Sequence, residues 1–126
     1  MRMATEAQAF GELGERIASH WLRRKGWRML GRRFRNGHRD IDLVVECDDT
    51  VVFVEVKARR TNDFGGPVEA VGWRKRRELT RSAQVWIDRF GRPGQSYRFD
   101  VIGVLVDQTG VWVRHVENAF LITSRA

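Results

Sequence analysis

The sequence is poor in cysteine and in long hydrophobic runs. Cys47 is the only cysteine among 126 residues, so no intramolecular disulfide and no zinc site built on several cysteines can form. The longest aliphatic run, Val101–Val106 with Gly103 inside it, is far too short to cross a bilayer. Residues Met1–Phe10 lack the apolar core of a signal peptide. We therefore expect a cytoplasmic protein with no membrane partner.

Acidic residues are outnumbered by basic ones. The chain has 23 Lys and Arg against 16 Asp and Glu, which gives a net charge of +7 and a pI near 10.9. Such a surplus attracts polyanions, either nucleic acid or an acidic membrane surface, and a merely solubilising surface is the alternative. No predicted helix sets a basic face opposite an uninterrupted apolar one, which disfavours a membrane. Nucleic acid is the expected partner, with DNA favoured over RNA.

Internal repeats, low-complexity tracts and linkers are also missing. Hydrophobic residues make up 42% of the chain and charged residues 31%, a balance typical of a folded globular protein with one core. We therefore treat residues 1–126 as a single domain.

Periodicity and turn residues predict seven elements. Apolar residues at helical spacing predict a helix from Glu6 to Lys25, ended by Gly26. A second helix is expected from Pro67 to about Arg89. Five strands complete the set, with a short tail from Glu117: Trp27–Phe34, Arg39–Glu46, Val51–Lys57, Tyr97–Val106 and Val111–Val116. The order α-β-β-β-α-β-β predicts a mixed α/β fold, a central mixed sheet of about five strands flanked by helices.

The hairpin of residues 39–57 carries the most informative pattern. A two-residue turn at its centre sets a register in which Asp42 lies opposite Glu55. The same register sets Asp40 opposite Lys57. Because side chains alternate along a strand, every charge then shares one face. The other face would hold only the apolar pairs Ile41–Val56, Leu43–Val54 and Val45–Val52.

Three carboxylates on neighbouring strand positions repel one another, because cross-strand Cβ atoms lie only about 5 Å apart. Mg²⁺, or Mn²⁺ in its place, would remove the repulsion between Asp40, Asp42 and Glu55, since it prefers carboxylate oxygen and water. Lys57 beside it could hold or deprotonate an attacking water. The alternative is an ion-paired strand face, and the residue pattern leaves both interpretations open.

Several motifs recur together across nearly the whole chain. They are Gly14-Glu15-x-x-Ala18, Asp40-Ile41-Asp42-Leu43, Val52-Phe53-Val54-Glu55-Val56-Lys57-x-Arg59, Gly65…Ala70…Lys75 and Arg98-Phe99-Asp100-Val101. In this combination the chain resembles the YraN-like family, small bacterial proteins placed in the PD-(D/E)xK superfamily with restriction endonucleases and archaeal Holliday-junction resolvases. The resemblance implies a restriction-endonuclease-like fold and Mg²⁺-dependent endonuclease activity on DNA, including branched recombination or repair intermediates.

The resemblance also assigns roles to residues. It implies that Asp42 and Glu55 are the acidic metal ligands and that Lys57 is the catalytic lysine. The resolvase-like branch adds a glutamate of the first helix, here Glu15. Arg39-Asp40 stands where the family has Gly-Glu, so Asp40 keeps the charge on a shorter side chain and is a third candidate ligand. A resolvase-like activity would also predict a two-fold symmetric homodimer.

Basic residues near the ends of elements bordering the predicted site are candidates for binding nucleic-acid phosphates. They are Arg35, Arg39, Arg59, Arg60, Arg74, Lys75 and Arg77. Lys75 falls in the apolar stripe of the second helix, so it is either a snorkelling lysine or a contact of the site. Asp100 is either a neighbour of the site or half of a salt bridge.

Two further points leave the function open. The five tryptophans are expected in the core and at its rim, with one or two able to stack on an unpaired base. The competing function is a basic nucleic-acid-binding module that does not cleave, for example as a subunit of a larger DNA-processing assembly.

Overall fold

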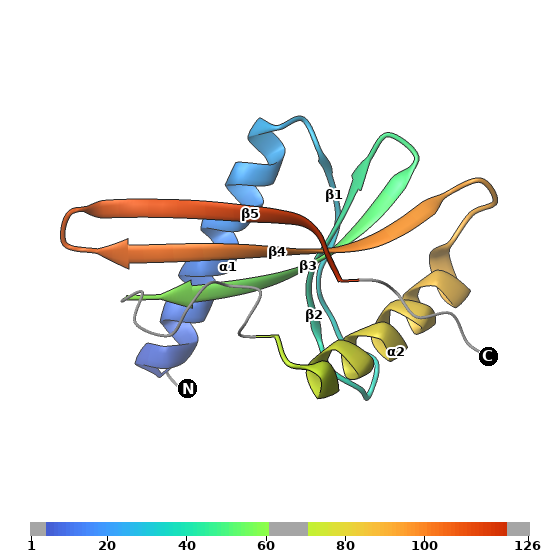
Figure 1. Cartoon of the computed structure of the whole chain (residues 1–126), viewed down its shortest axis with the longest axis horizontal. Coiled ribbons are helices and arrows are strands. Elements are labelled where there is room, and N and C mark those ends of the chain that lie inside the picture. Colours follow the sequence, from blue (N-terminus) through green and yellow to red (C-terminus); the bar gives the residue numbers. More distant parts are fainter. Residues whose placement is uncertain (1–4, 61–70, 121–126) are drawn as a thin grey trace, which may run out of the picture.

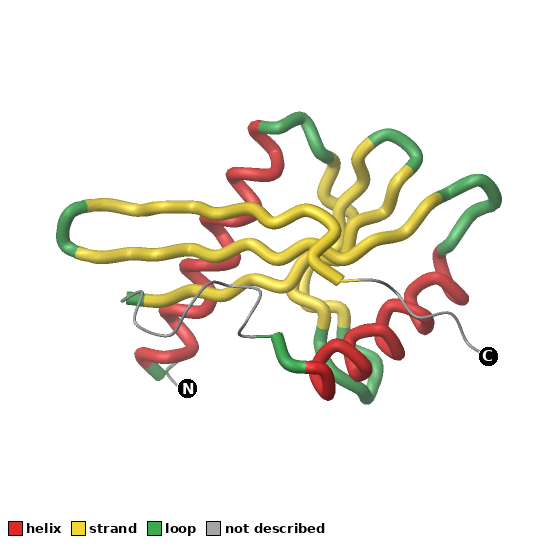
Figure 2. The backbone as a smooth tube through the Cα atoms, viewed as in Figure 1, coloured by secondary structure: helices red, strands yellow, loops and turns green. Residues whose placement is uncertain are grey.

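The computed structural model of the chain describes residues 5–60 and 71–120. Within them, two helices and five strands follow the predicted order (Figure 1 and Figure 2). The elements are α1 (Glu6–Arg24), β1 (Arg28–Phe34), β2 (Ile41–Cys47), β3 (Thr50–Arg59), α2 (Trp73–Phe90), β4 (Ser96–Asp107) and β5 (Gly110–Phe120). The mixed α/β fold predicted from the sequence is confirmed. Neither of the helices in these two ranges has the length and apolar character that crossing a membrane requires.

The five strands form one sheet in the order β1-β2-β3-β4-β5. All neighbours are antiparallel except β3 and β4, which are parallel. Parallel neighbours need a crossover connection, and α2 lies in that connection. The β2–β3 hairpin has the predicted register, with a two-residue turn at Asp48-Asp49 and the pairs Leu43–Val54 and Val45–Val52.

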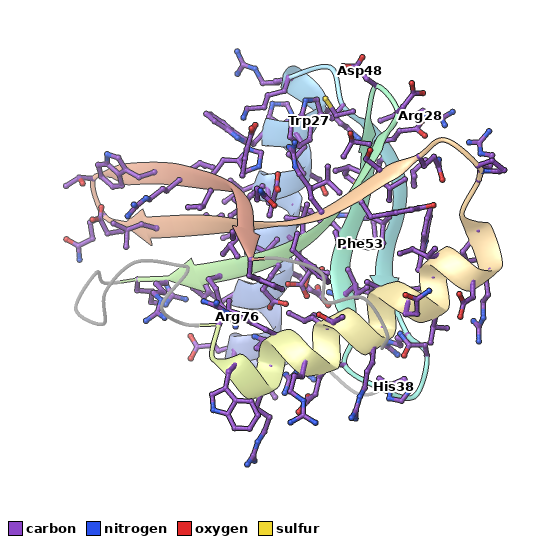
Figure 3. All side chains as sticks on the ribbon, turned by 45° about the vertical axis from the view of Figure 1, so that its right-hand side comes forward. Trp27, Arg28, His38, Asp48, Phe53 and Arg76 are labelled. Carbon is purple, nitrogen blue, oxygen red and sulfur yellow. The ribbon has the colours of Figure 1, made fainter. Side chains whose placement is uncertain are left out.

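Each face of the sheet packs against one helix. On the first face, Ala18 and Leu22 of α1 pack against the apolar residues Leu43, Val45, Val52 and Val54. On the second face, Leu79, Ala83 and Trp86 of α2 pack against Val44, Phe53 and Phe99. Phe53 lies at the centre of this second layer (Figure 3), with its ring centroid 5.6 Å from that of Trp86. Because β2 and β3 are buried on both faces, their sequences are nearly continuous hydrophobic runs.

Helix α1 is fixed at both ends and approaches the sheet closely. Thr5 and Gln8 form a capping box at its start, and Gly26, with a φ of +86°, follows its end. In the middle of the helix, a Cβ atom on Gly14 would lie 2.6 Å from the Cβ of Ala58 in β3. Glycine at this position therefore lets the helix backbone lie directly on the strand.

Most predicted boundaries lie within two residues of the observed ones, but those of the second helix and the last strand are wrong. Helix α2 begins at Trp73, after the extended N-cap residue Gly72, and not at Pro67; Pro67 itself, with the motif positions Gly65 and Ala70, lies outside the described residues. Strand β5 runs to Phe120 rather than giving way to a tail at Glu117. It continues because Phe120 is buried and its ring stacks on that of Phe99, with centroids 4.7 Å apart.

The predicted pair Ile41–Val56 is also wrong, because strict alternation breaks at Asp42. The β2–β3 ladder ends at Leu43–Val54. The Val56 amide donates instead to Asp42 Oδ2, at 2.7 Å. Ile41 packs in the α2 layer, whereas Leu43 packs in the α1 layer. The Asp42 side chain thus takes the place of a strand contact where β2 and β3 separate.

Candidate active site

An open hollow with a volume of about 750 Å³ lies beside the separated ends of β2 and β3. Its lining comes from the β1–β2 loop, both strands and α2: Gly37, His38, Arg39, Asp40, Asp42, Glu55, Lys75, Glu78 and Arg81. His38 marks the loop side, next to α2, while Asp48 lies in the turn at the other end of the hairpin (Figure 3). The hollow therefore brings together residues from three separate parts of the sequence: residues 37–42, Glu55 and residues 75–81.

Asp42 and Glu55 form the acidic centre of the hollow. Glu55 is buried, with 5% of its surface exposed. Burial and then the charge of Glu55 raise the pKa of Asp42 to about 8, although the hydrogen bond from the Val56 amide opposes this rise. Ionisation of both carboxylates would concentrate negative charge where little water can screen it, so a cation beside them would favour the ionised form of Asp42.

Two lysines from different elements supply positive charge to this centre. Lys57 Nζ lies 3.5 Å and Lys75 Nζ 3.0 Å from the same Glu55 oxygen, Oε1. Burial and the neighbouring Lys75 lower the pKa of Lys57. Helix α2 brings Lys75 directly to Glu55, so Lys75 lies at the candidate site, and its role there stays a prediction.

Asp40 lies in the hollow but not opposite Lys57. It precedes β2, and its Oδ2 pairs with Arg35 Nε at 3.4 Å. The predicted Asp40–Lys57 opposition is therefore wrong, since the strand does not extend back to Asp40. Among residues 5–60 and 71–120, no three or more His, Cys, Asp or Glu side chains form a group that could hold a metal ion.

Glu15 lies beside the site rather than in it. Its Oε1 accepts a hydrogen bond from Arg33 Nε at 3.0 Å, and the two residues line a separate pocket. Arg33 has a φ of +49°, in the left-handed region, and also pairs with Glu12 at 3.3 Å. The charge of Glu15 nevertheless contributes to raising the pKa of Asp42, so helix α1 affects the site electrostatically.

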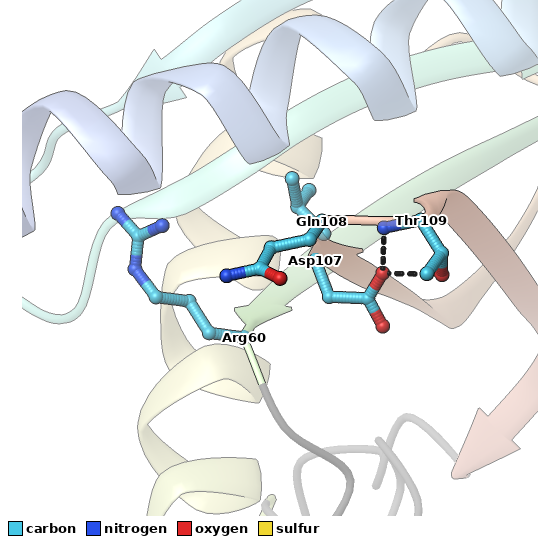
Figure 4. A pocket seen from close by; sticks show the side chains of 5 residues that line it. Arg60, Asp107, Gln108 and Thr109 are labelled. Carbon is cyan, nitrogen blue, oxygen red and sulfur yellow. Dashed lines mark hydrogen bonds between the residues drawn. The ribbon is translucent and has the colours of Figure 1, made fainter.

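The predicted phosphate-binding residues lie at several places in the fold. Arg39 lines the hollow, where it pairs with Glu78 at 2.8 Å. Arg35 pairs with Asp40, which also lines the hollow. Arg74 and Arg77 are exposed on α2, and Arg59 ends β3. Arg60 lies elsewhere: it lines a second pocket beside the β4–β5 turn (Figure 4), where Asp107 accepts hydrogen bonds from Thr109.

Sequence reasoning missed Glu78 and Arg81, which line the hollow from α2. A signal was present, since they follow Lys75 by three and six residues and so share one side of the helix. Ser82 on the same helix donates hydrogen bonds to the carbonyl of Arg39 and to Asn36 Oδ1. These bonds hold the β1–β2 loop against α2.

Asp100 is half of a salt bridge and does not line the hollow, which decides between its two interpretations. Its carboxylate is fully buried and accepts hydrogen bonds from Arg98 Nε at 3.0 Å and from the Asn118 amide at 2.9 Å. His115 Nε2 lies 2.7 Å from its second oxygen. Asn118, with a φ of +52°, lies where the β4–β5 register shifts. The carboxylate thus holds an irregular part of β5 in place.

Known proteins similar to this chain carry a family designation and no named activity. The profile of the family described as "Uncharacterised protein family UPF0102" matches residues 14–104. A UPF0102 protein of Chloroherpeton thalassium is 42% identical over 101 residues, covering 80% of this chain and 78% of the relative. One from Alkaliphilus oremlandii is 39% identical over 112 residues, covering 87% and 96%. One from Pelotomaculum thermopropionicum is 39% identical over 120 residues, covering 94% and 100%. The resemblance is confirmed at the level of the family, and the nuclease superfamily stays a prediction.

Proposed function

We propose, from the premise that the chain belongs to the uncharacterised protein family UPF0102, that it is a metal-dependent nuclease of the PD-(D/E)xK type. It would hydrolyse phosphodiester bonds in DNA, including branched recombination or repair intermediates. The observation that carries this proposal is the meeting of Asp42, Glu55, Lys57 and Lys75 at the end of the separating strands.

The acidic pair suits a hard divalent cation. Mg²⁺ usually takes only one or two protein carboxylates and completes its coordination with water and phosphate oxygens. Asp42 and Glu55 supply two such carboxylates, and their mutual repulsion gives a reason for a cation to bind there. Once bound, Mg²⁺ or Mn²⁺ would supply Lewis-acid polarisation of the scissile phosphate and a lower pKa for water. Asp40, on the rim, is available as an outer contact.

The lysines and arginines have separable roles in this proposal. Lys57 Nζ holds the attacking water and can accept its proton, which the lowered pKa of Lys57 favours. Lys75 balances the charge of Glu55 and faces the phosphate. Arg39 and Arg35 position the nucleic-acid backbone. The water oxygen bonds to phosphorus as the bond to the leaving oxygen breaks, and the leaving oxygen takes up a proton.

A second candidate function is a basic module that binds nucleic acid without cleaving it. Both lysines already pair with Glu55 Oε1, so the charge of this carboxylate is compensated without a metal ion. A non-cleaving module would keep the same contacts as a structural ion-pair network. The two functions differ in one respect, namely whether Glu55 is needed for bond breakage or only for holding the lysines.

Cleavage of a labelled panel tests the proposal. The panel contains single-stranded, duplex, flap and four-way-junction DNA, together with RNA, and is incubated with Mg²⁺ or Mn²⁺. We expect cleavage by the unmodified chain that chelator abolishes. Glu55→Gln should lose nearly all activity, and Lys57→Met should lower kcat by about 100-fold or more with little change in KM, as expected for a lost acid–base group.

Glu46→Gln is the matched control. Glu46, like Glu55, is a strand glutamate in an ion pair, with Arg28 at 2.6 Å, but it is only half-buried and lies near the opposite end of the hairpin. This variant should cleave like the unmodified chain. Binding without cleavage by the unmodified chain, over the whole panel and with both metals, would reject the nuclease and favour the binding module.

A further inference from the structure

Trp73 is unusually exposed for its size. It is 66% exposed, the highest value among the large hydrophobic side chains in the described part of the chain. The guanidinium of Arg77, one turn along α2, lies over its ring at 5.5 Å from the centroid. An open indole beside a cation is the combination that proteins use to bind single strands, because bases stack on the ring and phosphates pair with the charge.

Exposed arginines connect this tryptophan with the hollow. Arg74, Arg77 and Arg81 are exposed and spaced so that they share one side of α2. Within residues 5–60 and 71–120, neither Arg74 nor Arg81 has a hydrogen-bond or ion-pair partner. Arg81 also lines the hollow. The arginine side of α2 (Arg74, Arg77 and Arg81) therefore extends from Trp73 to the hollow, and the charges of Arg74 and Arg81 are unpaired within the part of the chain that the structure describes.

The first turn of α2 is charged against its own helix dipole. It contains no acidic residue, its N-cap Gly72 provides no side-chain hydrogen bond, and Arg74, Lys75 and Arg76 follow directly. Cations near a helix N-terminus are unfavourable, whereas an anion there is stabilised. A phosphate group beside this turn would offset both the arginine charge and the partial charge of the helix end.

Trp73 lies on the same turn of α2 as Lys75. Lys75 Nζ lies 3.0 Å from Glu55. Because residues two apart leave a helix on nearly opposite sides, and a helix with its side chains is about 10–12 Å across, the indole is separated from the acidic centre by at least the width of α2. A few nucleotides of extended strand span that distance.

We propose that Trp73 stacks on an unpaired nucleotide base a few nucleotides along the strand from the cleavage site, while the arginine side of α2 binds the phosphates of the same strand. This inference rests on the proposed nuclease function and adds the substrate class. In a duplex the faces of the bases are covered by their neighbours, so only an unpaired nucleotide offers a face to the indole. The substrate is therefore a single strand, or a flap, gap or junction with unpaired nucleotides near the cleavage point.

Binding without cleavage tests the stacking contact. The full-length chain is titrated, in chelator and at fixed salt, against a labelled single-stranded DNA and against the same sequence as a duplex, with fluorescence anisotropy as the readout. Trp73→Ala should weaken single-strand binding by about 5- to 100-fold, the loss expected for one stacked base. Duplex binding should change by less than about 2-fold. Trp73→Phe should restore most of the single-strand affinity.

Trp112→Ala is the matched control. Trp112 is 49% exposed but lies on β5, in the β4–β5 hairpin that projects away from α2 (Figure 1). The Trp112→Ala variant should bind the single-stranded and the duplex DNA as tightly as the unmodified chain does. Equal single-strand affinity of Trp73→Ala and the unmodified chain, or equal losses on both DNAs, would overturn the stacking contact while leaving Glu55-dependent cleavage intact. Absence of both binding and cleavage on every nucleic acid would overturn the nuclease function together with this inference.

Discussion

Two aspartates of the sheet, one on β2 and one on β4, lie in opposite electrostatic surroundings. Asp42 faces another carboxylate, so burial and the charge of Glu55 raise its pKa to about 8. Burial alone would also raise the pKa of Asp100, but hydrogen bonds from His115 and Arg98 outweigh burial and lower it. The first arrangement suits a site that binds cations, and the second stabilises the ionised form within the fold.

Asp100→Asn should destabilise the protein by about 3 kcal/mol at neutral pH, because it leaves buried Arg98 and His115 contacts without their anion. The effect should depend on pH. Since folding lowers the pKa of Asp100, its stabilisation is complete above the unfolded value of about 4 and is lost as the pH falls through the folded pKa. Urea unfolding across pH 2–7 measures this.

The control for this prediction is Asp49→Asn, at an exposed position in the β2–β3 turn. It should leave the unfolding free energy within about 0.5 kcal/mol of the unmodified value. Acid unfolding of Asp100→Asn that parallels the unmodified chain at every pH would contradict a stabilising role for the ionised carboxylate.

At the scale of elements, the contact of α1 with β3 determines where Glu15 can lie. Gly14 meets Ala58 with no room for a side chain. The next residue, Glu15, is consequently held near the sheet, where it pairs with Arg33 on β1. This contact explains why glycine is followed by glutamate in α1. Gly14 lets the helix lie close to β3, and Glu15 is then near enough to the sheet to pair with Arg33.

Gly14→Ala should destabilise the protein by about 1–3 kcal/mol, because the added Cβ would force α1 away from the sheet. Gly11→Ala on the same helix has nothing within 4 Å of the added atom. That control should stabilise by about 0.5–1 kcal/mol through helix propensity. Chemical denaturation of both variants distinguishes the two outcomes, and stabilisation of both would show that α1 has room to adjust.

At the scale of the whole molecule, the net charge is +7. The positions of the individual charges affect nucleic-acid binding more than this total does. Many arginines are already engaged with carboxylates, such as Arg28 with Glu46 and Arg39 with Glu78. Arg74, Arg77 and Arg81 are instead exposed on α2, and Arg81 lines the hollow. Removing a positive charge from α2 should therefore weaken the binding of a polyanion more than removing one elsewhere.

Arg74→Gln should reduce the salt dependence of single-strand binding. Each phosphate contact contributes about 0.7 to the slope of log K against log salt for a single strand, so the slope should become shallower by about that amount. Arg28→Gln removes the same charge near the far end of the hairpin and should leave the slope unchanged. Anisotropy titrations from about 50 to 200 mM salt provide the comparison. Identical slopes for both variants would indicate that net charge alone attracts the nucleic acid.

Local features of the sequence were sufficient to predict the order of elements and the β2–β3 register. Turn residues and two kinds of periodicity act over a few positions, and one register alone buries the apolar set. The same register identified Asp42, Glu55 and Lys57 as neighbours. Family membership, too, could be predicted from the motifs along the chain.

Tertiary packing decided the rest, because it depends on segments that the sequence separates widely. Only the position of α2 brings Lys75 to Glu55, and only the separation of β2 from β3 directs Asp42 to the Val56 amide. Packing likewise set the start of α2 at Trp73 and the end of β5 at Phe120. Packing also pairs Asp40 with Arg35 and Glu15 with Arg33, because the fold places these arginines of β1 and the loop after it beside the two carboxylates.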